Sequence, residues 1–71
     1  MPRTESRLHE PRFRALHWAA VAATQADRIT QAGGQLSPVQ RQQLLAHLAE
    51  AREHGITDDE IADYRRSNLY G

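Results

Sequence analysis

The chain has 71 residues, with nine arginines balanced by nine acidic residues, and it contains no lysine and no cysteine. This length allows one domain; the lack of cysteine excludes disulfides and cysteine-ligated zinc, and the zero net charge argues against a basic nucleic-acid coat protein or an acidic nucleic-acid mimic. The N-terminus lacks the apolar segment of a secretory signal, and the longest apolar run is far shorter than a membrane span, so we expect a cytoplasmic protein with no membrane partner.

The first predicted helix covers residues 11–32 and follows a flexible, arginine-containing arm of residues 1–10. Pro11 suits the first helical turn, where a missing N–H is not needed, and Gly33-Gly34 is a helix stop. At 100° per residue the apolar residues form two stripes on roughly opposite sides of this helix. One stripe holds Phe13, Leu16, Ala20 and Ala23, and the other holds Trp18, Val21, Ala22 and Ile29. Such a helix is either sandwiched between two other helices or paired with a second subunit.

The second predicted helix covers residues 38–54. Ser37 and Gln40 have the spacing of a capping box, with proline at the first helical position, and Gly55 follows the last turn. We expect an inward apolar stripe and a polar stripe on the opposite side. The inward stripe holds Leu44, Leu45, Leu48 and Ala51, and the polar stripe holds Gln43, His47, Glu50 and His54.

The third predicted helix covers residues 58–68. Thr57 and Glu60 form a second potential capping box, and Ile56 before the cap is placed to pack on Ile61 one turn later. No window alternates apolar and polar residues as a strand would. The sequence therefore predicts an all-α fold, a compact three-helix domain over residues 11–71.

Residues 55–62 read GITDDEIA and resemble the G-[LI]-[ST]-x-x-E-I-A segment of many helix-turn-helix regulators. In those proteins the segment is the supporting helix, and a separate recognition helix follows it. Here nine residues remain, without a second turn signal. If the third helix were itself the reader, the carboxylates of its first turn would face phosphates. Binding to DNA or RNA is therefore our alternative hypothesis. Its candidate residues are Arg3, Arg7, Arg12, Arg14, Arg65, Arg66 and Asn68.

Metal binding and catalysis have little support. His47, Glu50 and His54 share one helix face, but seven residues separate the two histidines by about 10 Å, too far for one shared ion. No glycine-rich phosphate loop follows a strand. Among the serines, Ser37 is explained as a helix cap, and we expect Ser6 and Ser67 to lie in mobile ends of the chain. We expect no metal, no cofactor and no enzymatic activity.

Our preferred hypothesis is a small regulatory or accessory protein that acts by protein–protein binding, of the kind that phages and mobile elements encode. Large apolar residues are few, so we also expect the domain to self-associate as a homodimer through its first helix. Two surfaces carry aromatic and arginine side chains, which are typical of protein interfaces. The candidate residues are Trp18, Val21 and Ile29 on one surface and Tyr64, Arg65, Arg66 and Tyr70 on the other.

Overall fold

Residues 10–69 of the chain are described by a computed structural model. The elements in this part are three α-helices, α2 (Pro11–Gln31), α3 (Pro38–Glu53) and α4 (Asp58–Asn68). They confirm the predicted all-α, three-helix fold, with two helices ending one residue earlier than expected. Within residues 10–69 there is no strand. The proposed arm lies almost wholly outside the described part, as do Arg3, Arg7 and Tyr70.

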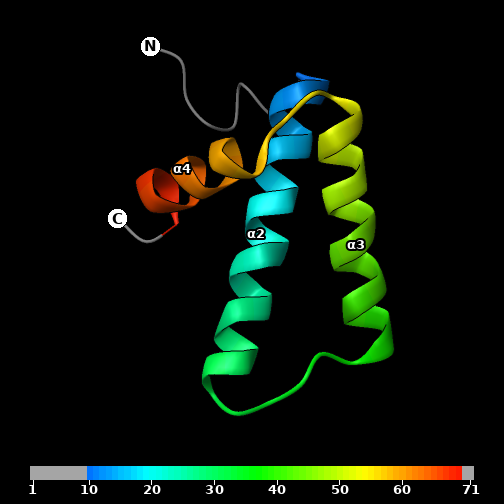
Figure 1. Cartoon of the computed structure of the whole chain (residues 1–71), viewed down its shortest axis with the longest axis vertical. Helices are drawn as coiled ribbons and strands as arrows, with labels where there is room; N and C mark the ends of the chain where they lie inside the picture. Colours follow the sequence, from blue (N-terminus) through cyan, green and yellow to red (C-terminus); the bar gives the residue numbers. More distant parts are fainter. Residues whose placement is uncertain (1–9, 70–71) are drawn as a thin grey trace.

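The chain is arranged as an antiparallel hairpin with a crossing helix (Figure 1). α2 and α3 run side by side, and their axes diverge towards the connection at residues 32–37. α4 crosses α2 near the opposite end of the hairpin, and α2 packs against both other helices. α2 is thus the central element, which was one of the two alternatives that its two apolar stripes left open.

The helix ends explain why local sequence located the elements so well. At the start of α3, the Ser37 hydroxyl accepts a hydrogen bond from the Gln40 N–H at 3.1 Å. The Gln40 side chain in turn accepts one from the Ser37 N–H at 2.9 Å, which completes the predicted capping box. At the start of α4, the Thr57 hydroxyl accepts from the Glu60 N–H at 3.1 Å. The Glu60 carboxylate, however, binds Arg12 on α2 rather than the Thr57 N–H, so only half of the second box forms.

The turn between α3 and α4 directs Ile56 into the core. Gly55 adopts a φ of 75°, in the left-handed region that glycine tolerates best. The N–H of Ile56 donates to the Ala51 carbonyl at 3.0 Å and that of Gly55 to the Arg52 carbonyl at 2.9 Å, the two bonds of a Schellman motif. Because this motif reverses the chain at once, Ile56 packs beside Ala51, and Ile61 joins it in the same buried cluster, as predicted.

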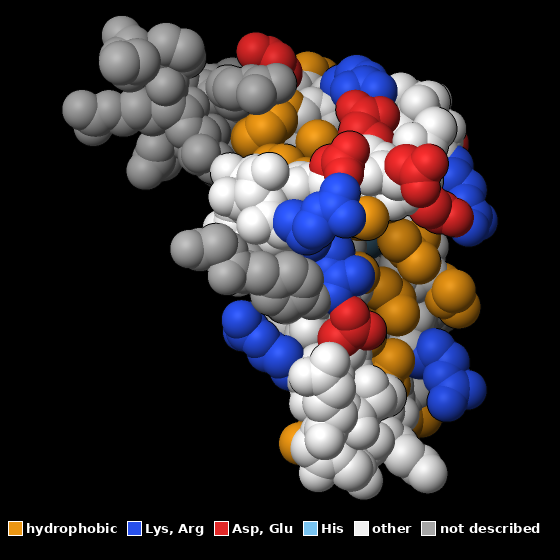
Figure 2. All heavy atoms as spheres, turned by 60° about the vertical axis from the view of Figure 1, so that its left-hand side comes forward, with side chains coloured by type: hydrophobic (Ala, Val, Ile, Leu, Met, Phe, Trp, Pro, Cys, Tyr) orange, Lys and Arg blue, Asp and Glu red, His pale blue; other side chains and the backbone are white. Residues whose placement is uncertain are grey.

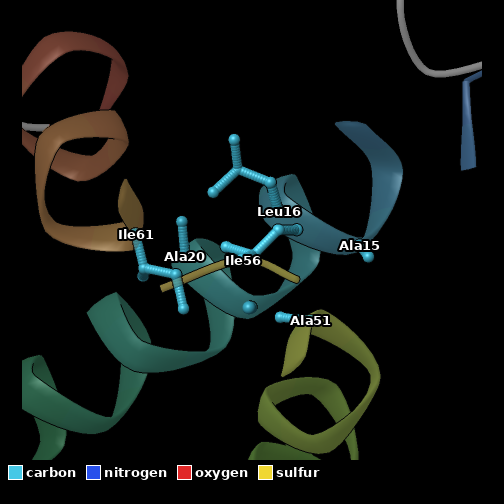
Figure 3. Packing of buried hydrophobic residues seen from close by; sticks show 7 residues of the cluster. Ala15, Leu16, Ala20, Ala51, Ile56 and Ile61 are labelled. Atoms are coloured by element: carbon cyan, nitrogen blue, oxygen red, sulfur yellow. The ribbon is translucent and has the colours of Figure 1, made fainter. Parts of the chain in front are cut away.

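The core is small and rich in alanine. Its buried cluster contains Ala15, Leu16, Ala19, Ala20, Ala51, Ile56 and Ile61. Figure 3 shows these side chains converging from α2, α3 and the start of α4. Ala19, Ala20 and Ala51 have no exposed surface, which allows close approach of the helix backbones. Most larger aliphatic side chains, such as Val21, Ile29 and Leu44, are only half-buried.

The predicted stripes of α3 were partly wrong. Leu45, expected to face inward, is 59% exposed, whereas His47, expected on the outer polar side, is half-buried against α2. The reason is that fully buried Ala51 lies at the centre of the α2 contact, so the inward line follows the spacing of Leu44, His47 and Ala51. A hydropathy pattern gives most weight to large aliphatic residues. The rotation of α3 about its axis follows instead from the close packing of Ala51 against α2.

Candidate protein-binding groove

The two predicted surfaces lie on different flanks of α2. The residues of α2 that contact α4, such as His17 and Asp27, occupy one flank. Trp18 and Ile29 occupy the other flank, beside α3. Charged side chains of both signs are intermixed on the α4 flank (Figure 2).

Tyr64 on α4 is engaged in contacts with α2. Its ring lies edge-on to Phe13, with centroids 5.6 Å apart, and its hydroxyl shares a 2.7 Å hydrogen bond with Nδ1 of His17. Phe13 is buried and the other two are half-buried. Edge-to-face packing with a satisfied hydroxyl stabilises the docking of α4 on α2. Tyr64 thus contributes to the fold of the domain.

Arg65 is likewise directed at α2. Its Nε donates to the Thr24 hydroxyl at 3.0 Å, and its guanidinium forms an ion pair with Asp27. The Arg65 side chain is 18% exposed, and Thr24 is buried. A planar guanidinium suits this position because it supplies several donors in fixed directions. Arg65 therefore acts as a polar bridge between α4 and α2.

The remaining candidate residues of the nucleic-acid hypothesis are divided between paired and exposed positions. Arg66 pairs with Asp63 on the surface of α4, and the Asn68 amide donates to the Tyr64 carbonyl at 3.0 Å. Arg12 donates two hydrogen bonds to Glu60, at 2.8 and 2.9 Å. Arg14 is exposed and has no ion pair within residues 10–69. The cations of α4 thus face carboxylates of this chain.

The ion pair between Arg12 and Glu60 allows a prediction for the pKa of the Glu60 carboxyl. The two hydrogen bonds from Arg12 hold the pKa of the Glu60 carboxyl below its ordinary value. A carboxyl whose pKa is lower in the folded state contributes stability above its unfolded pKa, and this contribution is lost as the pH falls through the folded pKa. In Arg12→Gln we expect the Glu60 pKa to rise, as followed by NMR of its side-chain carboxyl carbon. Arg14→Gln is the matched control and should leave the Glu60 titration unchanged. Equal Glu60 titrations in wild type and Arg12→Gln would contradict the assignment.

The groove lies between α2 and α3, where the hairpin diverges, and has a volume of about 240 Å³. All three residues predicted for the first surface, Trp18, Val21 and Ile29, line it together. The other lining residues are Ala22, Gln25, Ala26, Leu36, Gln40, Gln43, Leu44 and His47. No Asp, Glu, Lys or Arg side chain is among them. The groove thus combines an apolar floor with amide, imidazole and indole groups, the mixture typical of binding sites for uncharged protein surfaces.

Trp18 is held in a defined position although it is 44% exposed. Its ring stacks on His47 of α3 with centroids 6.4 Å apart and an interplanar angle of 24°. On its other side it meets His17 edge-on at 5.1 Å. A large aromatic side chain that is already oriented loses little conformational entropy when a partner covers it. Trp18 therefore has the properties of a binding anchor. Trp18 was predicted from the sequence as a binding residue. His47 and Gln43 were not, because the sequence analysis placed them on the outer side of α3.

Other kinds of site find little support in the described part of the chain. In residues 10–69, no group of three or more His, Asp or Glu side chains is arranged to hold a metal ion. None of α2, α3 and α4 combines the length and the hydropathy that a membrane-spanning helix needs.

Comparisons with known proteins found no relative of this chain. No protein-family model matches the chain, and neither does any curated protein or solved structure.

Proposed function

We propose that this chain is a non-enzymatic protein-binding module, and that the α2–α3 groove receives the apolar face of helices from another protein chain. The observation that carries the proposal is the half-exposed but stacked Trp18 at the head of an uncharged groove. Tryptophan is one of the residues enriched among those that contribute most of the binding energy at protein interfaces.

The shape of the groove favours a helical ligand. Two antiparallel helices that diverge leave a furrow parallel to their axes, and a helix packs into such a furrow with its side chains between the two ridges. α4 crosses α2 near one end of the hairpin, so this chain already shows that α2 can pack against a further helix. For nucleic acid, by contrast, the arginines of α4 pair with carboxylates of this chain, and that alternative stays a prediction.

Site-specific photo-crosslinking in the cells that produce the protein tests the proposal. A benzophenone amino acid replaces Gln25, which lines the groove, or Gln31, an exposed glutamine at the end of the same helix. We expect the Gln25 variant, but not the Gln31 variant, to form a protein adduct on irradiation. Adding Trp18→Ala should abolish that adduct. The proposal is overturned if the two positions crosslink equally, or if neither does.

A further inference from the structure

We propose that the protein chain that fills the groove is a second copy of this chain, in a two-fold dimer where α2 of each protomer packs on α3 of its partner. This inference rests on the proposed function and names the occupant of the same groove. The two hairpins together form a four-helix bundle that covers both Trp18 rings, while α4 of each protomer stays on the outer flank.

The uncharged lining of the groove favours self-association. In a two-fold interface the same patch meets itself, so any net charge on it would oppose a like charge. The polar lining residues are mainly amides, Gln25, Gln40 and Gln43. A primary amide both donates and accepts hydrogen bonds, so Gln25 on α2 can pair with the glutamines of the partner's α3.

The charges at the rim select the orientation of the two protomers. Arg14 lies one turn before Trp18 on α2, and Glu50 lies about one turn after His47 on α3. Because Trp18 stacks on His47, both charges lie at the same end of the groove. Each is exposed and forms no ion pair among residues 10–69. A two-fold axis parallel to the helices places α2 against the partner's α3. It keeps corresponding ends of the two grooves at the same end of the dimer, so Arg14 approaches the partner's Glu50.

The alternative two-fold axis, perpendicular to the helices, is disfavoured by the same residues. It would place the two α2 helices antiparallel against each other, with Trp18, Val21 and Gln25 at the crossing. Arg14 would then oppose the partner's Arg28, since the two positions lie at similar distances on either side of Val21. Arg28 is exposed and also forms no ion pair in the described part. Like charges directly across an interface are repulsive, so the parallel arrangement is the one that the charges support.

The available area fits a dimer of low affinity. The 16 residues of α3 span about 24 Å, and two helices side by side are about 20 Å wide. Stable interfaces bury about 800 Å² per partner, which is about 15% of the 5227 Å² accessible surface of this chain. The outline of the hairpin face, about 480 Å², is smaller than this, and an interface of that size is typical of weak, transient association. We therefore expect a dissociation constant in the micromolar range.

Sedimentation equilibrium of the full chain from about 1 to 500 µM tests the dimer. We expect a shift from the 8.0 kDa monomer to twice that mass, together with a blue shift of the single tryptophan's fluorescence. Trp18→Ala should weaken association at least about 30-fold, since the lost anchor counts twice in a symmetric dimer. Leu45→Ala, at a 59% exposed position on the side of α3 that faces away from the groove, is the control and should leave the mass distribution unchanged.

Charge exchange tests the orientation. Arg14→Glu and Glu50→Arg should each weaken the dimer about 5- to 10-fold, and the double variant should restore wild-type association. Arg28→Glu should have little effect in the parallel arrangement, whereas it would strengthen an antiparallel dimer by turning repulsion into attraction. Tighter association of Arg28→Glu, without rescue in the double variant, would overturn the parallel geometry.

Failure of the dimer is distinguishable from failure of the proposed function. If the chain stays a monomer at 500 µM with unshifted fluorescence, the second copy is excluded. A Gln25 crosslink to a protein of different mass would then leave the groove as the binding site of another partner. Absence of any groove-specific crosslink would remove the proposed function itself.

Discussion

Replacing Ile56 by alanine is expected to lower the free energy of unfolding by about 3 kcal/mol. Ile56 is 3% exposed and lies in the buried cluster with Ala51 of α3 and Ile61 of α4. Its loss leaves a cavity that the neighbouring alanines are too small to fill. Domains have roughly 0.05–0.15 kcal/mol of stability per residue, or about 4–10 kcal/mol for a chain of this length. One truncation thus removes a large part of the total.

Urea denaturation followed by circular dichroism measures this loss. It is performed at a protein concentration below the range of association, because dimerisation would add to the apparent stability. Val39→Ala is the matched control, since it removes a similar aliphatic group from a side chain that is 63% exposed. It should change the free energy of unfolding by less than about 0.5 kcal/mol. Similar losses in the two variants would show that Ile56 is not the centre of the core.

The extent of the helices was predictable because their ends depend on local chemistry. The capping box of Ser37 and Gln40 forms as predicted. Gly55 follows the end of α3 as expected, and the hydrogen bonds of the Schellman motif there are made within a few residues of sequence. The partners of Glu60 were not predictable in this way. Its carboxylate had a local N–H within reach but pairs with Arg12, which is distant in the sequence and is brought near only by the crossing of α4 over α2.

The register of α3 was not predictable from hydropathy for a related reason. A stripe drawn through Leu44, Leu45 and Leu48 assigns the centre of the contact to the largest apolar side chains. In this fold the contact is centred on Ala51, which packs against the alanines of α2 with no exposed surface. The rotation that results turns His47 and Gln43 into the groove. The candidate anchor Trp18 was therefore found from the sequence, whereas its stacking partner was not.

The adjacent residues Arg65 and Arg66 show most clearly that tertiary contacts could not be predicted from the sequence. Arg65 and Arg66 have identical side chains and were predicted to share one surface. In the fold, Arg65 is 18% exposed and bridges α4 to Thr24 and Asp27 of α2. Arg66 is 71% exposed and pairs only one turn away, with Asp63. A rotation of 100° about the helix axis separates a tertiary contact from a surface pair, and the sequence alone does not fix the direction in which α4 faces.

Arg65→Met is expected to lower the free energy of unfolding by about 2 kcal/mol, whereas Arg66→Met should change it by less than about 0.5 kcal/mol. Methionine preserves the length and helix propensity of arginine, so the difference isolates the polar contacts. Arg65 holds the hydroxyl of buried Thr24, which loses its donor in the variant, and Asp27 loses a cation. Because Asp27 is half exposed, water replaces most of that ion pair, and the larger share of the loss comes from Thr24.

Removing the Thr24 hydroxyl in Thr24→Val should therefore make a subsequent Arg65→Met less costly, as a double-mutant cycle in urea would measure. Equal losses for Arg65→Met and Arg66→Met, or strictly additive losses in the cycle, would mean that α4 does not dock on α2 through Arg65.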